Sequence, residues 1–208
     1  TGPALPLWEN ESMSWFPEEL YWIMSCTAWA DWKEIREVRN AWGMNMSLRR
    51  EAFEKAGYFI TDFGLCDSSR KGWVDPPSED VDLSIKIKQK TGKRIVYDPK
   101  VKVRHRVHKY RIGLRFIMRR SYSVGYQRRM LRRLYQAEEN SRNLFEDEHR
   151  LLKRIFTRLF PSIPKTFFTN PVIAWHRLSV TITALTFVAL GYYSHLFRPF
   201  CRQTPSAN

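Results

Sequence analysis

The most constraining feature of the sequence is a run of twenty residues near the C-terminus, Leu178 to Phe197, that contains no Asp, Glu, Lys or Arg. A helix of that length spans about 30 Å, the hydrocarbon thickness of a bilayer. Trp175, Arg177, Arg198 and two tyrosines flank the run as interfacial residues do. We therefore expect residues 171–208 to form a transmembrane or membrane-associated helix and tail, with a buried or re-entrant helix as the alternative.

Charge is concentrated in one segment. The 208-residue chain has a formal net charge of +14, and the segment from Lys100 to Ala137 holds thirteen Lys or Arg and no acidic residue. Such a segment favours an anionic partner: acidic lipid, a phosphorylated substrate or nucleic acid. Basic residues ahead of the uncharged run indicate that the globular part faces the cytoplasm. The hydrophobic share of 43% is enough for a folded core, so disorder is not the default, and the composition excludes collagen-like and low-complexity chains.

The region before the basic segment alternates between strand and helix patterns, which predicts an α/β fold. Ser47 is a candidate N-cap, and Gly57 and Gly92 are expected to end helices. The predicted elements are a strand from Val38 to Met46, helices at Arg49–Ala56 and from Ser78 to Gly92, and strands at Lys93–Tyr97 and Val101–His105.

Two amphipathic helices are expected next. The first runs from Arg111 to Ala137 with a bend at Gly125, and the second runs from Leu144 to Phe160 and ends at Pro161 and Pro164. We accordingly divide the chain into an α/β part (1–110), basic amphipathic membrane-surface helices (111–170) and the membrane-associated segment (171–208).

Three acidic residues lie in the first turn of the helix predicted from Ser78 to Gly92. Glu79, Asp80 and Asp82 lie on one turn, so two of them could face a cleft, one as a general base and one as a hydrogen-bond acceptor for a substrate. Simple helix capping is the alternative. His105 ends a predicted strand, and a helix start and a strand end can meet at one edge of an open sheet. It is either a metal ligand or an ordinary surface histidine.

Together these motifs resemble the second half of a family 2 inverting glycosyltransferase. The resemblance rests on Trp42-Gly43-Met44-Asn45-Met46-Ser47 with Ala56-Gly57-Tyr58-Phe59, on Glu79-Asp80-Val81-Asp82-Leu83, on Tyr97-Asp98-Pro99 and on Val101 to His105. It implies the acceptor-side half of a GT-A type, Rossmann-like domain. The nucleotide-binding half would precede residue 1, so this chain alone is expected to be inactive.

The resemblance also implies roles for individual residues. Asp80 would be the catalytic base and Glu79 its catalytic support, while His105 would help to hold a divalent metal, Mg²⁺ or Mn²⁺. The expected substrate-binding residues are Asp82, Trp42, Gly43, Asn45, Arg119 and Arg120.

A narrower similarity is to archaeal glycosyltransferases that extend sugars on dolichyl phosphate, including glucuronosyltransferases. It rests on Pro17 to Trp22, on Ser25-Cys26-Thr27 and on the basic segment from Arg119 to Tyr126. It implies a nucleotide sugar donor, a lipid-linked glycan acceptor and a place at the cytoplasmic leaflet of the cell membrane. A nucleic-acid-binding module is disfavoured, because no groove-reading motif is present and a membrane segment follows. A basic lipid anchor without catalysis stays open as an alternative.

Overall fold

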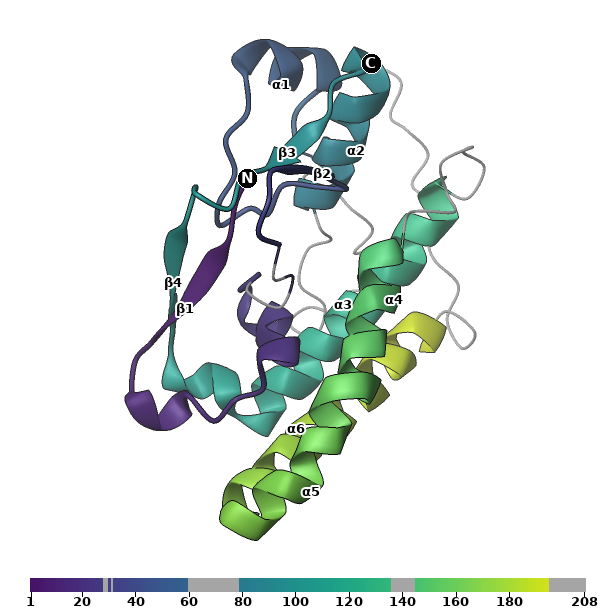
Figure 1. The fold of residues 1–208 in the computed structure, drawn as a ribbon. Coiled ribbons are helices and arrows are strands. Elements are labelled where there is room, and N and C mark those ends of the chain that lie inside the picture. Colours follow the sequence, from purple (N-terminus) through teal and green to yellow (C-terminus); the bar gives the residue numbers. More distant parts are fainter. Residues whose placement is uncertain (28–29, 31, 60–78, 136–144, 195–208) are drawn as a thin grey trace.

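The computed structural model describes residues 1–27, 30, 32–59, 79–135 and 145–194, and it mixes helices with short strands as the α/β prediction requires (Figure 1). β2 and β3 lie with α1 and α2 at one end of the molecule, β1 and β4 run along one side, and α5 with the adjoining part of α6 lies at the other end. Two hydrophobic cores follow this division.

Two pairs of strands organise the first part of the chain. β1 (Ala4–Trp8) pairs in parallel with β4 (Val103–Val107), and β2 (Arg36–Val38) pairs antiparallel with β3 (Ile95–Tyr97). The strand predicted from Val38 to Met46 is wrong beyond Val38. The chain turns back there, because the amide of Asn45 donates to the carbonyl of Trp42 at 2.8 Å.

The two shorter helices match their predictions closely. α1 (Arg50–Ala56) ends at Gly57 with φ 86°, and α2 (Glu79–Thr91) ends at Gly92 with φ 64°, the left-handed backbone that favours glycine. The predicted cap at Ser47 is wrong: Arg49 holds the cap position, and no side chain caps α1. Ser78 lies outside the described residues.

The basic helix α3 (Leu114–Tyr135) packs along the largely apolar helix α6 (Pro171–Tyr193), and this is the most extensive contact between two elements of the described chain. Their backbones touch at two glycines. A methyl group at Gly125 would collide with the carbonyl of Val188, and one at Gly191 would collide with the carbonyl of Tyr122. Gly125 thus permits close packing of the two helices, and α3 is one continuous helix; a bend at Gly125 stays a prediction.

The second amphipathic helix is longer than predicted. α4 (Glu146–Arg154) continues through a π-helical segment (Ile155–Leu159) into α5 (Phe160–Thr169). Pro161 does not end the helix, because it falls in the first turn after the π segment, where the regular hydrogen-bond ladder is already interrupted.

The apolar helix begins earlier than the uncharged run. Asn170 caps α6 by accepting a hydrogen bond from the amide of Ile173 at 3.1 Å, and Pro171 occupies the first turn. Among the described residues, α6 is the helix with the length and composition to cross a membrane.

The two cores draw on different parts of the chain. The first core joins the 3-10 helices Glu11–Met13 and Glu18–Met24 to α3, the π segment and α6. Its buried members are Met13, Phe16, Leu20, Ile23, Met24, Cys26, Val107, Ile117, Ile155, Leu159, Val180 and Ala184. The second core lies between β2, β3, α1 and α2. Its buried members are Val38, Ala41, Ala56, Leu83, Ile87, Ile95 and Tyr97.

Candidate active site

The carboxylate of Asp80 is the centre of the candidate site. It lies in the first turn of α2, where the helix dipole and the free amides favour a negative charge. Its Oδ2 accepts a hydrogen bond from the amide of Gly43 at 3.1 Å, and its Oδ1 accepts one from the amide of Val81 at 2.8 Å. Each oxygen has a second lone pair, so the carboxylate can still accept a proton from a substrate hydroxyl.

The turn that carries Gly43 is held from several sides. The side-chain amide of Asn45 donates to the carbonyl of Val101 at 2.8 Å, and the hydroxyl of Thr1 donates to the carbonyl of Asn45 at 2.7 Å. Trp42 packs edge-on against Tyr97, with ring centroids 6.0 Å apart. Three predicted substrate-binding residues, Trp42, Gly43 and Asn45, are therefore brought beside Asp80, although Asn45 and Trp42 also have structural contacts.

A short hydrogen-bond chain fixes this turn to α2. The buried hydroxyl of Ser84 accepts from the amide of Ala41 at 3.1 Å and donates to the carbonyl of Asp80 at 2.6 Å. The distance between the turn and the Asp80 carboxylate is thus set by backbone groups on both sides.

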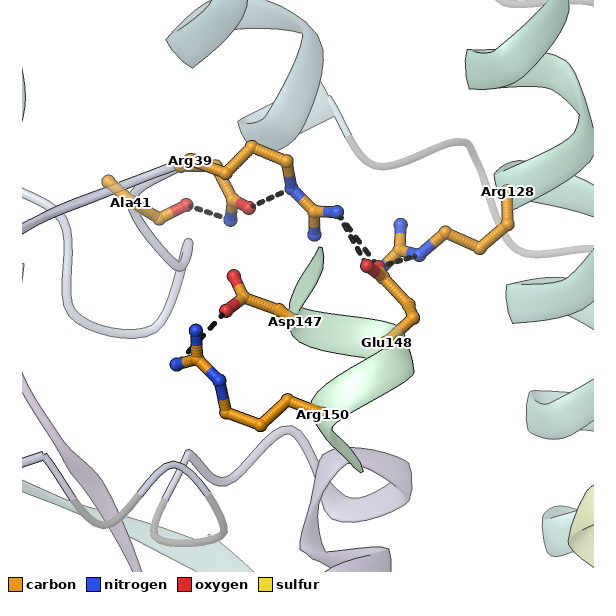
Figure 2. Close-up of polar contacts among 7 residues, drawn as sticks. Arg39, Ala41, Arg128, Asp147, Glu148 and Arg150 are labelled. Atoms are coloured by element: carbon orange, nitrogen blue, oxygen red, sulfur yellow. Dashed lines mark hydrogen bonds and ion pairs between the residues drawn. The ribbon is translucent and has the colours of Figure 1, made fainter. Parts of the chain in front are cut away.

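Glu148, on α4, forms ion pairs with arginines from two other parts of the chain (Figure 2). Both its oxygens lie 2.9 Å from Nη1 of Arg39, which follows β2, and its Oε1 lies 2.6 Å from Nε of Arg128 on α3. All three side chains are largely buried. The adjoining residue Asn40 accepts from Nε of Arg39 at 3.0 Å and donates to the carbonyl of Ala41 at 2.9 Å, so the cluster is continuous with the turn.

The pKa shifts of Glu148 and Arg128 reflect both their burial and their mutual attraction. Burial raises the pKa of Glu148, but the guanidinium groups of Arg128 and Arg39 outweigh burial and hold the pKa below its ordinary value. Burial lowers the pKa of Arg128, against the attraction of Glu148 and of Asp80. Asp147, on the same turn as Glu148, also faces Arg39, and Asp80 lies within electrostatic reach of Arg128.

Asp82 points away from the Gly43 turn, into the protein. It is 3% exposed, its Oδ1 accepts from the hydroxyl of Tyr135 on α3 at 2.7 Å, and its Oδ2 lies 2.7 Å from Nζ of Lys86. These contacts give the carboxylate a structural role. Its predicted role in substrate binding stays a prediction.

His105 lies on β4 and is not joined to the Asp80 turn by any hydrogen bond or ion pair of the described residues. Its Nε2 is 3.1 Å from Nη1 of Arg111, and burial, then Arg111 and His108, lower its pKa, so the imidazole is neutral at pH 7. A guanidinium so close opposes a bound cation. The described residues contain no cluster of three or more His, Cys, Asp or Glu able to hold a metal, so they do not form a metal centre by themselves.

Three predicted site residues make no described contact with the Asp80 carboxylate or the Gly43 turn. Glu79 is exposed at the start of α2, next to Asp80. Arg119 and Arg120 lie in the middle of α3, the first exposed and the second half-buried, and both have partners. A role for these three residues in catalysis or substrate binding stays a prediction.

Arg39, Arg128 and Glu148 are not among the site residues predicted from the sequence. A usable signal was present, because only five acidic residues follow residue 99 and three of them are Glu146, Asp147 and Glu148. Acids placed directly after a strongly basic segment are candidates for pairing with it. The motif-based choice of Arg119 and Arg120 did not use this signal.

A helix-start carboxylate beside a backbone turn, in an α/β protein, defines a candidate group-transfer enzyme with a general base. The chain belongs to the glycosyl transferase family group 2, whose model matches residues 21–196. It is also 28% identical over 199 residues to the glucosyl-dolichyl phosphate glucuronosyltransferase of Haloferax volcanii, a match that covers 95% of this chain and 60% of the relative. The chain thus spans about three fifths of that relative's length. No solved structure matches it significantly.

Proposed function

We propose that the protein transfers a sugar, glucuronic acid by analogy with the relative, from a nucleotide sugar to a glycan on dolichyl phosphate, with inversion at the anomeric carbon. The observation that carries the proposal is the Asp80 carboxylate, fixed by the amide of Gly43 within the region that matches the family. The relative's name supports the donor sugar and the lipid acceptor.

In the proposed step, the acceptor hydroxyl oxygen attacks the anomeric carbon and forms the new glycosidic bond. The bond between that carbon and the phosphate oxygen of the nucleotide breaks, and the oxygen leaves with the electron pair. The hydroxyl proton passes to Asp80. The amides of Gly43 and Val81 orient the carboxylate, so no reorganisation is needed when the proton moves.

The basic helices suit an acceptor that carries phosphate in a membrane. Arg119 and Arg120 on α3 are the proposed contacts for acceptor phosphate, as a pair of fork-shaped donors. The proposal places the catalytic part at the cytoplasmic face, consistent with the basic residues that precede α6. A divalent metal stays a prediction and would need ligands beyond His105.

Substitution of Asp80 by Asn tests the proposal. In the protein expressed with any sequence that precedes residue 1 in its gene, Asp80→Asn is expected to lower transfer by about 10³-fold, the contribution of a general base. The assay follows radiolabelled sugar from a panel of nucleotide sugars into extracted membrane lipid. Nucleotide binding should be unchanged, because Asn keeps an oxygen for the Gly43 amide.

Glu51→Gln, on the exposed first turn of α1, is the matched control and should transfer sugar normally. Glu79→Gln should give an intermediate loss. If Asp80→Asn retains transfer within about twofold of the unaltered protein, Asp80 is not the base.

A further inference from the structure

The side of α6 that faces away from α3 is apolar along the whole helix. We call this surface the outer stripe. Its large side chains are each between 51% and 66% exposed, and they recur at helical spacing: Val172, Trp175, Ile182, Leu190 and Tyr193. Ser179, Thr186 and Ala189 complete the stripe, so it holds no charged residue. The outer face of a helix that packs against a protein in water is ordinarily polar.

Both ends of α6 are attached to the rest of the protein. Near its beginning, Nε of Arg177 donates to the carbonyl of Trp15 at 3.0 Å, and Val180 and Ala184 are buried in the first core. Near its end, the hydroxyl of Tyr192 accepts from Arg132 at 2.7 Å. A helix crossing a bilayer would carry one of these ends, with its partners, to the opposite side.

The helix beside α6 is also unsuited to hydrocarbon. α3 carries seven arginines, and its backbone contacts α6 at Gly125 and Gly191. Because these contacts leave no room for lipid between the two helices, α3 would have to enter the bilayer together with α6. Charged side chains inside a bilayer are strongly unfavourable unless they pair or reach the interface.

Charge indicates what covers the outer stripe. From His149 to the C-terminus the sequence has eight Lys or Arg and no acidic residue. Lys153, Arg158 and Lys165 are exposed on the helix that includes α4 and α5, and α5 packs beside α6. A second copy of the chain would bring two such cationic surfaces together, whereas an anionic lipid surface would neutralise them.

We propose that α6 lies in the surface plane of an anionic membrane, with the outer stripe among the lipid headgroups, and does not cross the bilayer. Trp175 and Tyr193, near the two ends of the stripe, are the aromatic types found at this depth. The proposal goes beyond sugar transfer, and its tests measure no transfer, so the two can fail separately.

The first test measures binding of the full chain to vesicles of phosphatidylcholine and phosphatidylglycerol, three to one, by cosedimentation. The triple variant Trp175→Ser, Ile182→Ser, Leu190→Ser should bind roughly tenfold more weakly. The matched control removes three equally exposed apolar side chains elsewhere, Ile35→Ser, Val96→Ser and Val101→Ser, and should bind normally. Binding should also fall with added salt and with phosphatidylcholine alone. Equal binding by the two triple variants would overturn the proposal.

The second test determines whether α6 lies on the membrane surface or crosses the bilayer. In a chain with Cys26→Ala, Cys66→Ser and Cys201→Ser, single cysteines are introduced as Thr169→Cys or Ser194→Cys, one beyond each end of α6. A membrane-impermeant maleimide added to sealed, inverted cell-membrane vesicles should label both positions. Labelling of one position only, until detergent is added, means that α6 crosses the bilayer and overturns the proposal.

A third measurement tests whether a protein, and not lipid, covers the outer stripe. Sedimentation of the lipid-free chain should give a monomer. A dimer that the stripe substitutions dissociate, or binding to an acidic protein in place of vesicles, would show that a protein covers the stripe, and would overturn the proposal.

Discussion

The two hydrophobic cores differ in how they are assembled along the sequence. The second core, beside the candidate site, uses residues between Val38 and Tyr97. The first core collects residues from Met13 to Ala184, nearly the whole described chain. The region around Asp80 is therefore built from nearby segments, and the helical layer depends on contacts between distant ones. The Glu148 cluster and the Tyr135 hydroxyl connect the two regions.

The largest stability effect is expected where the helical layer is closest packed. Gly125→Ala places a methyl group against the backbone of α6, which cannot yield as a side chain can, and should lower the free energy of unfolding by about 3 kcal/mol. Thr186→Ala, on the outer stripe, should change it by less than about 0.5 kcal/mol. Urea unfolding measures both. Equal stability of the two variants would show that α3 and α6 are not in backbone contact.

The second effect concerns the link at Glu148. Glu148→Gln leaves Arg39 and Arg128 without their anion, and we expect a loss of about 2 kcal/mol, below the roughly 3 to 5 kcal/mol of a fully buried pair because some solvent reaches the group. Glu146→Gln, an exposed acid on the same turn, is the control and should cost under about 0.5 kcal/mol.

The same link predicts a pH dependence. Because the pKa of Glu148 is lowered on folding, its stabilisation is complete above the ordinary value of 4.5 and declines as pH falls below it. The difference in unfolding free energy between the protein and Glu148→Gln should therefore shrink on acidification. A difference that grows toward low pH would contradict the assigned ion pairs.

The smallest effect tests the second link. Tyr135→Phe removes the hydrogen bond to Asp82 and should cost about 1 kcal/mol, while Lys86 still pairs with the carboxylate. Tyr110→Phe, at an exposed tyrosine, should be neutral. Chemical denaturation compares the two. If Tyr135→Phe is neutral in stability but reduces sugar transfer, the pair of Tyr135 and Asp82 belongs to the substrate site, as the motif predicted.

The features that could be predicted from the sequence are those built from neighbouring residues, as the second core is. The helix at Glu79, its end at Gly92 and the short strand near Tyr97 depend on local patterns, and the structure contains all three. Family resemblance assigned both Gly43 and Asp80 to the site, but it did not predict the hydrogen bond between them, because no local rule brings together residues 37 positions apart.

The features that could not be predicted depend on contacts between residues far apart in the sequence. The local sequence of α3 gave no sign that Gly125 would meet α6, because the backbone that it contacts, at Val188, lies 63 positions away. Likewise, the pairing of Arg39 with Glu148 spans 109 positions. Pro161 was interpreted from its usual helix-breaking effect, but the π segment before it changes which backbone amides need partners.

The hydrogen bond from Tyr135 to Asp82 has a mechanical consequence. It fastens the last turn of α3 to the first turn of α2, two residues from Asp80, while α3 is braced backbone to backbone against α6. α6, α3 and the start of α2 are therefore connected in series. If α6 lies on a membrane as proposed, its orientation there would also set the orientation of the Asp80 carboxylate relative to the lipid.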